Sequence, residues 1–238
     1  MSERLVTLQP GFLIRHWPYG ETSLLTDVLT RDFGRISILA RGLRKPKSKM
    51  AGMLRPFFPL LLSYGAGRGE LHYLSHAEPQ FPAFDSSLHG KALFCGFYIN
   101  ELITHFLHQS DPHPEVFELY QQTLLALQNG DEVESCVRCF EVNLLELVGY
   151  GLDLRYDSQT HQLVEVDKKY HFSVEQGATE AANGEINGAT LHALHSRQFK
   201  DKESLLQAKK IMRMVIDFHL QGKLLKSRET IAKIIKQL

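Results

Sequence analysis

The chain has 238 residues, of which 43% are hydrophobic and 23% charged, a globular composition sufficient for one large or two small domains. Its densest apolar run, residues 57–62, contains Pro59 and is too short to cross a bilayer, and no apolar leader opens the chain, so we expect neither a membrane span nor a secretory signal. Three cysteines, Cys95, Cys136 and Cys139, are too few and odd in number for a disulfide framework, which indicates a reducing, cytoplasmic location.

The formal net charge is zero, but the charges are segregated along the chain. Residues 1–69 contain eleven Lys or Arg and four Asp or Glu, and residues 197–238 contain the same numbers. Residues 70–196 contain five basic and nineteen acidic residues, whereas residues 33–69 contain no carboxylate. Two cationic ends suggest two surfaces for a polyanion such as nucleic acid, although each run could also be an ordinary solvated face.

The first 80 residues predict short strands separated by turn segments, among them residues 17–20. The predicted strands are residues 11–16, 23–30, 35–42, 57–65 and 70–78. In the third of them Ile36, Ile38 and Ala40 alternate with Arg35, Ser37 and Leu39, the period of a strand with one buried face. Five short strands predict a small closed barrel, and the OB-fold is the commonest such barrel that binds oligonucleotides.

Helical periodicity replaces this pattern after Pro82. The predicted helices are residues 88–108, 114–128, 131–151, 202–220 and 227–238. Residues 151–188 are polar and contain a hairpin-like pair of runs, 163–166 and 170–174. We therefore predict an α+β protein in which residues 1–80 form a five-stranded OB-fold barrel. Residues 81–238 would form a mainly α-helical domain that carries the hairpin-like insertion.

The predicted connection between the third and fourth strands is the first candidate DNA-binding site. Single-stranded nucleic acid is bound by cationic grooves that follow the phosphates and by aromatic faces on which bases stack. The candidate cations are Arg35, Arg41, Arg44, Lys45, Lys47, Lys49 and Arg55. Phe33, Tyr64 and Tyr73 are candidate stacking residues, unless they belong to the barrel core.

A second candidate cationic surface lies near the carboxyl end. Its residues are Lys209, Lys210, Arg213, Lys223, Lys226 and Arg228. Lys209 and Arg213 share a helix face opposite Ile211 and Val215, and the amino end of the final helix adds partial positive charge for a phosphate. The alternative is an ordinary solvated helix surface.

Motifs for metal binding and catalysis are missing from the sequence. Cys136 and Cys139 have the spacing of half a zinc site, but no second pair exists and both fall within a helical pattern, so we expect small helix residues and no metal site. The sequence contains no phosphate-binding loop, no nucleophile elbow and no H-E-x-x-H motif, and no acidic cluster sits on a motif of a metal-dependent nuclease. We therefore expect a protein that is not an enzyme.

Several strings, in order along the chain, resemble the RecO family of bacterial DNA repair proteins. The strings are "ETSLLTDVLTRDFGRISILARGLRKPKSK" (21–49), "LRPFFPLLLSYGAGRGELHYLSHAE" (54–78), "YINELI" (98–103), "FEVNLLELVGYGLDL" (140–154) and "GKLLKSRE" (222–229). The resemblance implies an OB-fold, a helical domain and a mediator without nucleotide hydrolysis, working in the cytoplasm at the nucleoid. Such proteins bind single- and double-stranded DNA, anneal strands coated with single-stranded DNA-binding protein (SSB) and, with RecR, help RecA to displace SSB.

Many members of that family carry a four-cysteine zinc site after the central helix. Here residues 149–151 are followed by a segment without cysteine, so the chain resembles the zinc-free branch and no metal is carried over. The resemblance also implies an SSB-tail site at Arg138, because an acidic tail with a free carboxylate needs a cation beside an apolar pocket. The alternative is that Arg138 pairs with Glu134 or Glu141. A self-associating scaffold, with basic ends meeting acidic middles, is the alternative function.

Overall fold

The computed structural model describes residues 5–46, 48, 50, 52–66, 71–80, 87–130 and 132–235, and the side chains of all of these except 66 and 231–235. The chain divides into two compact units, residues 1–129 and 130–238, and each is described separately. The domain boundary after residue 80 stays a prediction from the sequence. The first compact unit extends to residue 129 and therefore contains two helices in addition to the barrel.

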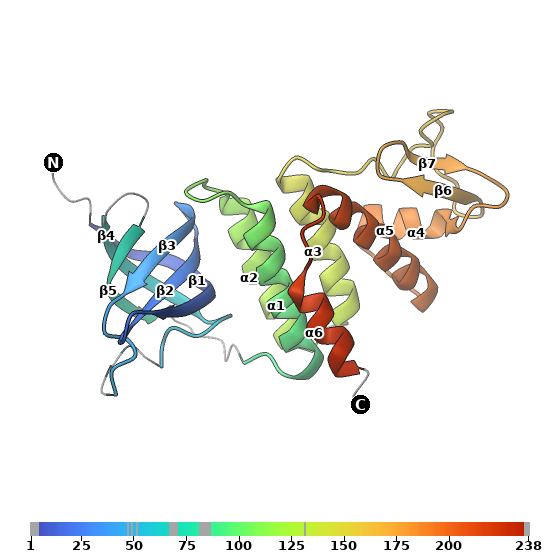
Figure 1. Cartoon of the computed structure of the whole chain (residues 1–238). Helices are drawn as coiled ribbons and strands as arrows, with labels where there is room; N and C mark the ends of the chain where they lie inside the picture. The colour runs from blue at the N-terminus through green and yellow to red at the C-terminus, as the bar shows by residue number, and fades with distance from the viewer. Residues whose placement is uncertain are drawn as a thin grey trace. The chain divides into compact units, whose positions relative to one another are not determined.

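A closed five-stranded barrel forms most of the first unit (Figure 1). Its strands are β1 (Val6–Tyr19), β2 (Ser23–Thr30), β3 (Gly34–Ala40), β4 (Pro59–Ala66) and β5 (Leu71–Pro79). They follow the order β1-β2-β3-β5-β4, and β4 pairs with β1 to close the barrel. Only the β3–β5 pair is parallel. This arrangement confirms the predicted barrel and its OB-fold character.

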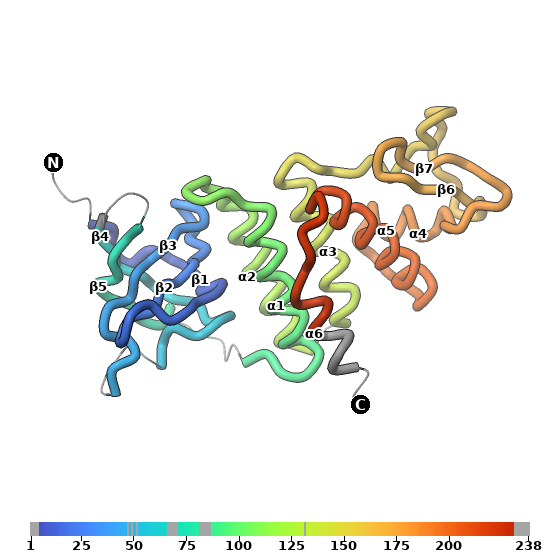
Figure 2. Tube along the Cα trace, in the orientation of Figure 1, coloured from blue at the N-terminus to red at the C-terminus, as the bar shows by residue number. Residues whose placement is uncertain are grey.

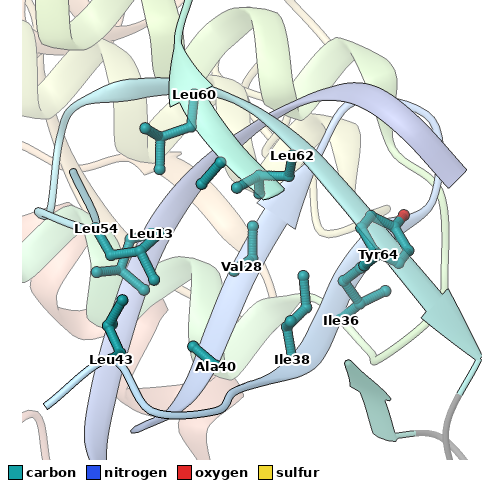
Figure 3. Packing of buried hydrophobic residues seen from close by; sticks show 11 residues of the cluster. Leu13, Val28, Ile36, Ile38, Ala40, Leu43, Leu54, Leu60, Leu62 and Tyr64 are labelled. Carbon is teal, nitrogen blue, oxygen red and sulfur yellow. The ribbon is translucent and has the colours of Figure 1, made fainter. Parts of the chain in front are cut away.

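Alternating residues of each strand fill the barrel interior. Val28, Ile38 and Leu62 are at most 2% exposed, and Figure 3 shows them pointing toward one another between the strands. Because Ile36, Ile38 and Ala40 point inward, Ser37 and Leu39 belong to the outer face of β3. Tyr64, a predicted stacking residue, lies in this core at 1% exposure, and burial raises the pKa of its phenol well above its usual range.

One difference from the predicted strands concerns residues 17–20, which the sequence placed in a turn. Trp17, Pro18 and Tyr19 instead continue β1, pairing with Leu25, Leu24 and Ser23 of β2. All residues from 15 to 20 are exposed, so the β1–β2 ribbon extends past the barrel body. The chain then turns at Gly20, whose φ of 58° lies in the left-handed region.

Two helices of the first unit, α1 (Gly90–Phe106) and α2 (Pro114–Gln128), cover part of the outer face of the barrel. Asn100 on α1 donates from Nδ2 to the carbonyl of Ile14 at 2.8 Å and accepts from the Tyr120 hydroxyl at 2.7 Å. Phe12 on β1 packs against Phe117 and Tyr120, with ring centroids 5.3 and 5.1 Å apart. This end of the outer face is therefore covered by helix.

The second unit combines helices with a small sheet (Figure 1). Its elements are α3 (Val133–Leu147), β6 (Lys169–Ser173), β7 (Gly177–Glu180), β8 (Ile186–Asn187), α4 (Gly188–Ser196), α5 (Lys202–Leu220) and α6 (Lys226–Ile235). The sheet order is β7-β6-β8. Asp201 caps α5 by accepting from the Ser204 backbone N–H at 2.7 Å, and Gly222 follows the helix end, as the break predicted there requires.

The hairpin in this unit differs from the predicted one. The run at 170–174 coincides with β6, but its hairpin partner is β7 rather than residues 163–166. In that earlier run only Leu163 makes a β-bridge, an isolated one with Tyr156. The helix α4 was not predicted, because nine residues with two leucines carry little periodic signal.

Candidate nucleic-acid interface

The connection between β3 and β4 begins beside the tip of the β1–β2 ribbon, and Figure 2 shows the described part of it in the first unit. The Arg44 backbone N–H donates to the carbonyl of Thr22 at 2.8 Å, and its Nη1 donates to the carbonyl of Gly20 at 3.3 Å. A turn closed by the Lys45 N–H and the Gly42 carbonyl, 3.2 Å apart, follows at once. The two bonds from Arg44 hold the start of the connection to the ribbon.

Four predicted cations of this connection are exposed: Arg41, Arg44, Lys45 and Arg55. Two of them lie over aromatic rings, with the Arg41 guanidinium 4.0 Å from the centroid of Tyr73 and that of Arg55 4.9 Å from Phe58. In the described part of the chain none of the four has a carboxylate within ion-pair distance. Their charge therefore remains available to an anion. We call these four residues the barrel cations.

The prediction for Arg35 is not supported by its surroundings. Arg35 is 8% exposed, donates from Nη1 to Asp27 Oδ2 at 2.7 Å, and donates from Nε and Nη2 to the Leu107 carbonyl at 3.2 and 3.1 Å. Through these bonds Arg35 holds the segment directly after α1 against the barrel. Lys47 and Lys49 lie outside the described residues.

The carboxyl-terminal cations are more strongly neutralised than the barrel cations. Lys210 pairs with Glu185, and Asp217 pairs with both Arg213, at 3.7 Å, and Arg228. The remaining members, Lys209, Lys223 and Lys226, are exposed. Exposed ion pairs are weak, so a phosphate could still compete for these cations, but the nearby carboxylates lower the local positive potential.

Exposed aromatic residues also lie on the barrel, and one of the three predicted stacking residues is among them. Phe33 is 42% exposed, Tyr73 is half-buried beneath Arg41, and Tyr64 belongs to the core. The sequence reasoning missed Trp17 and Tyr19, which are 38% and 52% exposed on β1. Their two-residue spacing, continuing from Arg15, was the signal for a strand face that the turn assignment concealed.

The predicted SSB-tail residue, Arg138 on α3, has a side chain only 10% exposed. Its Nη2 donates to Glu141 Oε1 at 2.8 Å, so the pairing with Glu141 that the sequence left open is present. On the same helix, burial raises the pKa of the Cys139 thiol, whose Sγ lies 3.5 Å from the Arg197 carbonyl.

The described residues contain neither a metal-binding cluster nor a membrane-spanning helix. Within them no group of three or more His, Cys, Asp or Glu side chains is arranged to hold a metal ion. In the same residues, no helix combines the length and the apolar character that a bilayer crossing requires.

Fold and site together define a class: a protein with an OB-type barrel that presents the exposed barrel cations, followed in the chain by a helical unit. Two family models match the chain, "Recombination protein O N terminal" over residues 1–82 and "Recombination protein O C terminal" over residues 88–229. The chain therefore belongs to the RecO family of DNA repair proteins.

Curated relatives support this assignment over nearly the full length. The chain is 40% identical over 226 residues to the "DNA repair protein RecO" of Methylococcus capsulatus, an alignment that covers 94% of this chain and 92% of the relative. It is 40% identical over 243 residues to the protein of that name from Dechloromonas aromatica, covering 98% and 96%. The RecO of Coxiella burnetii is 39% identical, covering 96% and 99%.

Proposed function

We propose that the chain is a non-enzymatic mediator of recombinational repair that binds single- and double-stranded DNA and anneals complementary strands coated with SSB. The observation that carries the proposal is the group of barrel cations, which are exposed and have no carboxylate partner among the described residues. Relatives of similar length are named DNA repair proteins, which agrees with a DNA ligand.

Phosphate binding gives such a protein affinity without sequence preference. Lys and Arg that neutralise phosphates release counterions, and the affinity that results falls as salt rises. Contacts to the backbone leave the base edges of a bound strand accessible to a complementary strand. Bringing two strands together on one protein lowers the entropic cost of their encounter, so annealing requires no chemical step. With RecR, the same protein would help RecA to replace SSB, in the cytoplasm at the nucleoid.

Recruitment of SSB is assigned to Arg138. An acidic peptide with a free carboxylate matches a guanidinium fork. The Arg138 side chain is only 10% exposed and its Nη2 donates to Glu141, so a tail carboxylate would have to bind beside this ion pair. Arg138→Ala should weaken binding of an SSB tail peptide about tenfold and leave the affinity for naked DNA unchanged. Arg155→Ala, which removes an exposed arginine of the same unit, is the control. Equal peptide affinity in Arg138→Ala and the parent would remove Arg138 from the site.

The proposal is tested by annealing SSB-coated complementary oligonucleotides with the full chain. We expect faster annealing than with SSB alone, and a smaller acceleration when SSB lacks its tail. The alternative scaffold would self-associate at low salt without DNA and would not accelerate annealing. That outcome would refute the proposal, and cleavage of the DNA in the presence of Mg²⁺ would refute its non-enzymatic part.

A further inference from the structure

The outer face of the barrel has one end that the helices leave open. At the covered end Phe12 and Leu29 are fully buried and Arg35 is nearly so. At the other end Trp17 and Tyr19 are 38% and 52% exposed. The strands β1, β2, β3 and β5 are consecutive in the barrel, so their outward residues form one continuous surface between these two ends.

The strand register places aromatic residues at both sides of this open face. Trp17 pairs with Leu25, Leu25 pairs with Leu39, and Leu39 pairs with Tyr73. Paired residues of neighbouring strands point to the same side, so this row of four lies on the outer face. Between the two rings Leu25 is half-buried and Leu39 is only 6% exposed, so the accessible positions are at the ends of the row. Three strand spacings separate Trp17 from Tyr73, about 14 Å. Tyr19 shares the side of Trp17, two residues farther along β1.

Each end of the row is accompanied by an arginine. The Arg15 guanidinium lies 5.3 Å from the Trp17 ring centroid and is held there by an Nε bond to the buried Asp27 carboxylate at 3.0 Å. Arg41 covers the Tyr73 ring at 4.0 Å. Arginine planes and aromatic rings both accept a stacked base, and the arginine also offers donors to a neighbouring phosphate.

We propose that this open face is the base-stacking platform for single-stranded DNA, with Trp17 and Tyr19 stacking bases beside the Arg41–Tyr73 pair. The proposal rests on the proposed function and specifies how the barrel tells a single strand from a duplex. Trp17 and Tyr19 are exposed on the same face of one strand, and the cations beside the aromatic residues favour a polyanion over an apolar protein partner. The bases of a duplex are already paired and stacked, so they cannot use these rings.

Trp17 is the only tryptophan in the sequence, so the fluorescence of the full chain reports on this position alone. Titration with oligo(dT) should quench that fluorescence, because a stacked base changes the surroundings of the indole. A DNA hairpin duplex should also bind, as the anisotropy of a labelled hairpin would show. Titration with this duplex should change the tryptophan emission little.

Substitutions give a second readout by anisotropy with labelled oligo(dT) and hairpin. Trp17→Ala should weaken oligo(dT) binding about tenfold, the loss of one stacked base, and change hairpin binding by less than about twofold. Trp17→Phe should retain most of the affinity. The matched control is Tyr156→Ala, which removes a ring of the second unit that is also 38% exposed and also lies beside an arginine, Arg155 at 5.4 Å, and should change neither affinity. The salt dependence should be the same in Trp17→Ala and the parent, because no phosphate contact is removed.

The outcomes separate this inference from the proposed function. If oligo(dT) binds with the expected salt dependence but neither quenches Trp17 nor distinguishes Trp17→Ala from the parent, the stacking platform is refuted and DNA binding stands. Equal losses for oligo(dT) and hairpin would also refute it, since stacking predicts a selective loss. If the parent binds neither DNA, both the inference and the proposed function fail.

Discussion

At the scale of single residues, the buried carboxylate of Asp27 determines what two neighbouring arginines do. Asp27 is completely buried, and its Oδ2 accepts from Arg35 at 2.7 Å and from Arg15 at 3.0 Å. A buried charge is tolerable only while it is paired, so these arginines are tied to the barrel structure. Arg15 keeps half of its side chain in solvent, whereas Arg35 is enclosed.

Arg35→Ala should therefore lower stability rather than DNA affinity. Removing one partner of a buried ion pair costs up to about 3–5 kcal/mol, and the buried Asp27 would keep only the half-exposed Arg15 as its partner. Urea denaturation should show this loss of unfolding free energy, and the folded fraction of the variant should bind oligo(dT) as the parent does. Arg41→Ala, at an exposed position, should change stability by less than about 0.5 kcal/mol and weaken binding. An unfolding free energy of Arg35→Ala equal to that of the parent would contradict a structural role for Arg35.

In the second unit, Asp157 is a buried carboxylate stabilised by backbone donors. Its Oδ1 accepts from the backbone N–H groups of Gln159 at 2.9 Å and Thr160 at 2.7 Å, and its Oδ2 accepts from that of Glu180. These bonds, above all the one from Thr160, hold the pKa of Asp157 below its ordinary value of 3.8. A lowered folded-state pKa contributes stability above the unfolded-state pKa, and this contribution is lost as the pH falls through the folded-state value.

Asp157→Asn should cost about 1–3 kcal/mol of unfolding free energy at pH 7, since an amide nitrogen then faces backbone donors. The difference between parent and variant should be constant above pH 5 and should shrink as the pH drops below 3.8. Urea denaturation at pH 7, 5, 4 and 3 measures both quantities. A difference that does not depend on pH would show that the charge of Asp157 is not what its donors stabilise.

At the scale of elements, the strand and helix patterns predicted most of the fold. Apolar residues recur every two residues in the long strands and every three to four residues in the long helices, and both periods can be recognised in the sequence. The ribbon at 17–19 was missed because Trp-Pro-Tyr-Gly has turn composition. Here the strand leaves the barrel body, and Pro18 occurs where both faces of the ribbon are exposed. The hairpin partner of β6 was missed because β7 is only four residues long, Gly177–Glu180, and contains one apolar side chain, Ala178.

The turn between β2 and β3 shows a constraint that no local pattern reveals. Gly34 has a φ of 66°, and a Cβ at this position would lie 2.0 Å from the carbonyl oxygen of Asp111, in the loop between α1 and α2. The glycine therefore lets that loop approach the barrel at van der Waals distance. Because the contact spans more than 70 residues of sequence, only the folded unit shows why this position must be glycine.

Gly34→Ala should lower the unfolding free energy by more than about 2 kcal/mol, because the backbone of the loop must move as well as the turn. Gly20→Ala is the matched control: its φ of 58° is similar, but nothing lies within 4 Å of its Cβ. The control should cost only the left-handed strain, about 1 kcal/mol. Equal costs in urea denaturation would show that the Asp111 contact is not significant.

At the scale of the whole molecule, the sequence predicted where positive charge concentrates but not which charges remain available. Arg35 and Arg138 looked like the other candidates, yet both are buried and paired with carboxylates. Arg35 meets Asp27 only when β2 and β3 pair, and the ion pair of Arg138 with Glu141 is buried only because that face of α3 is covered. A count of charges along the sequence shows neither effect. At the carboxyl end, Asp217 and Glu185 offset part of the positive charge, so we place the principal DNA contact on the barrel cations.

The salt dependence of single-stranded DNA binding tests this placement most directly. The slope of log affinity against log salt should be near −4 for the parent, as for about six neutralised phosphates. The triple variant Arg44→Ala, Lys45→Ala, Arg55→Ala should reduce its magnitude by about 2, at about 0.7 for each lost contact. The control Lys169→Ala, Lys200→Ala, Lys202→Ala removes the same charge at exposed positions of the second unit and should leave the slope near that of the parent. Equal slopes for the two triple variants would contradict the barrel as the phosphate-binding surface.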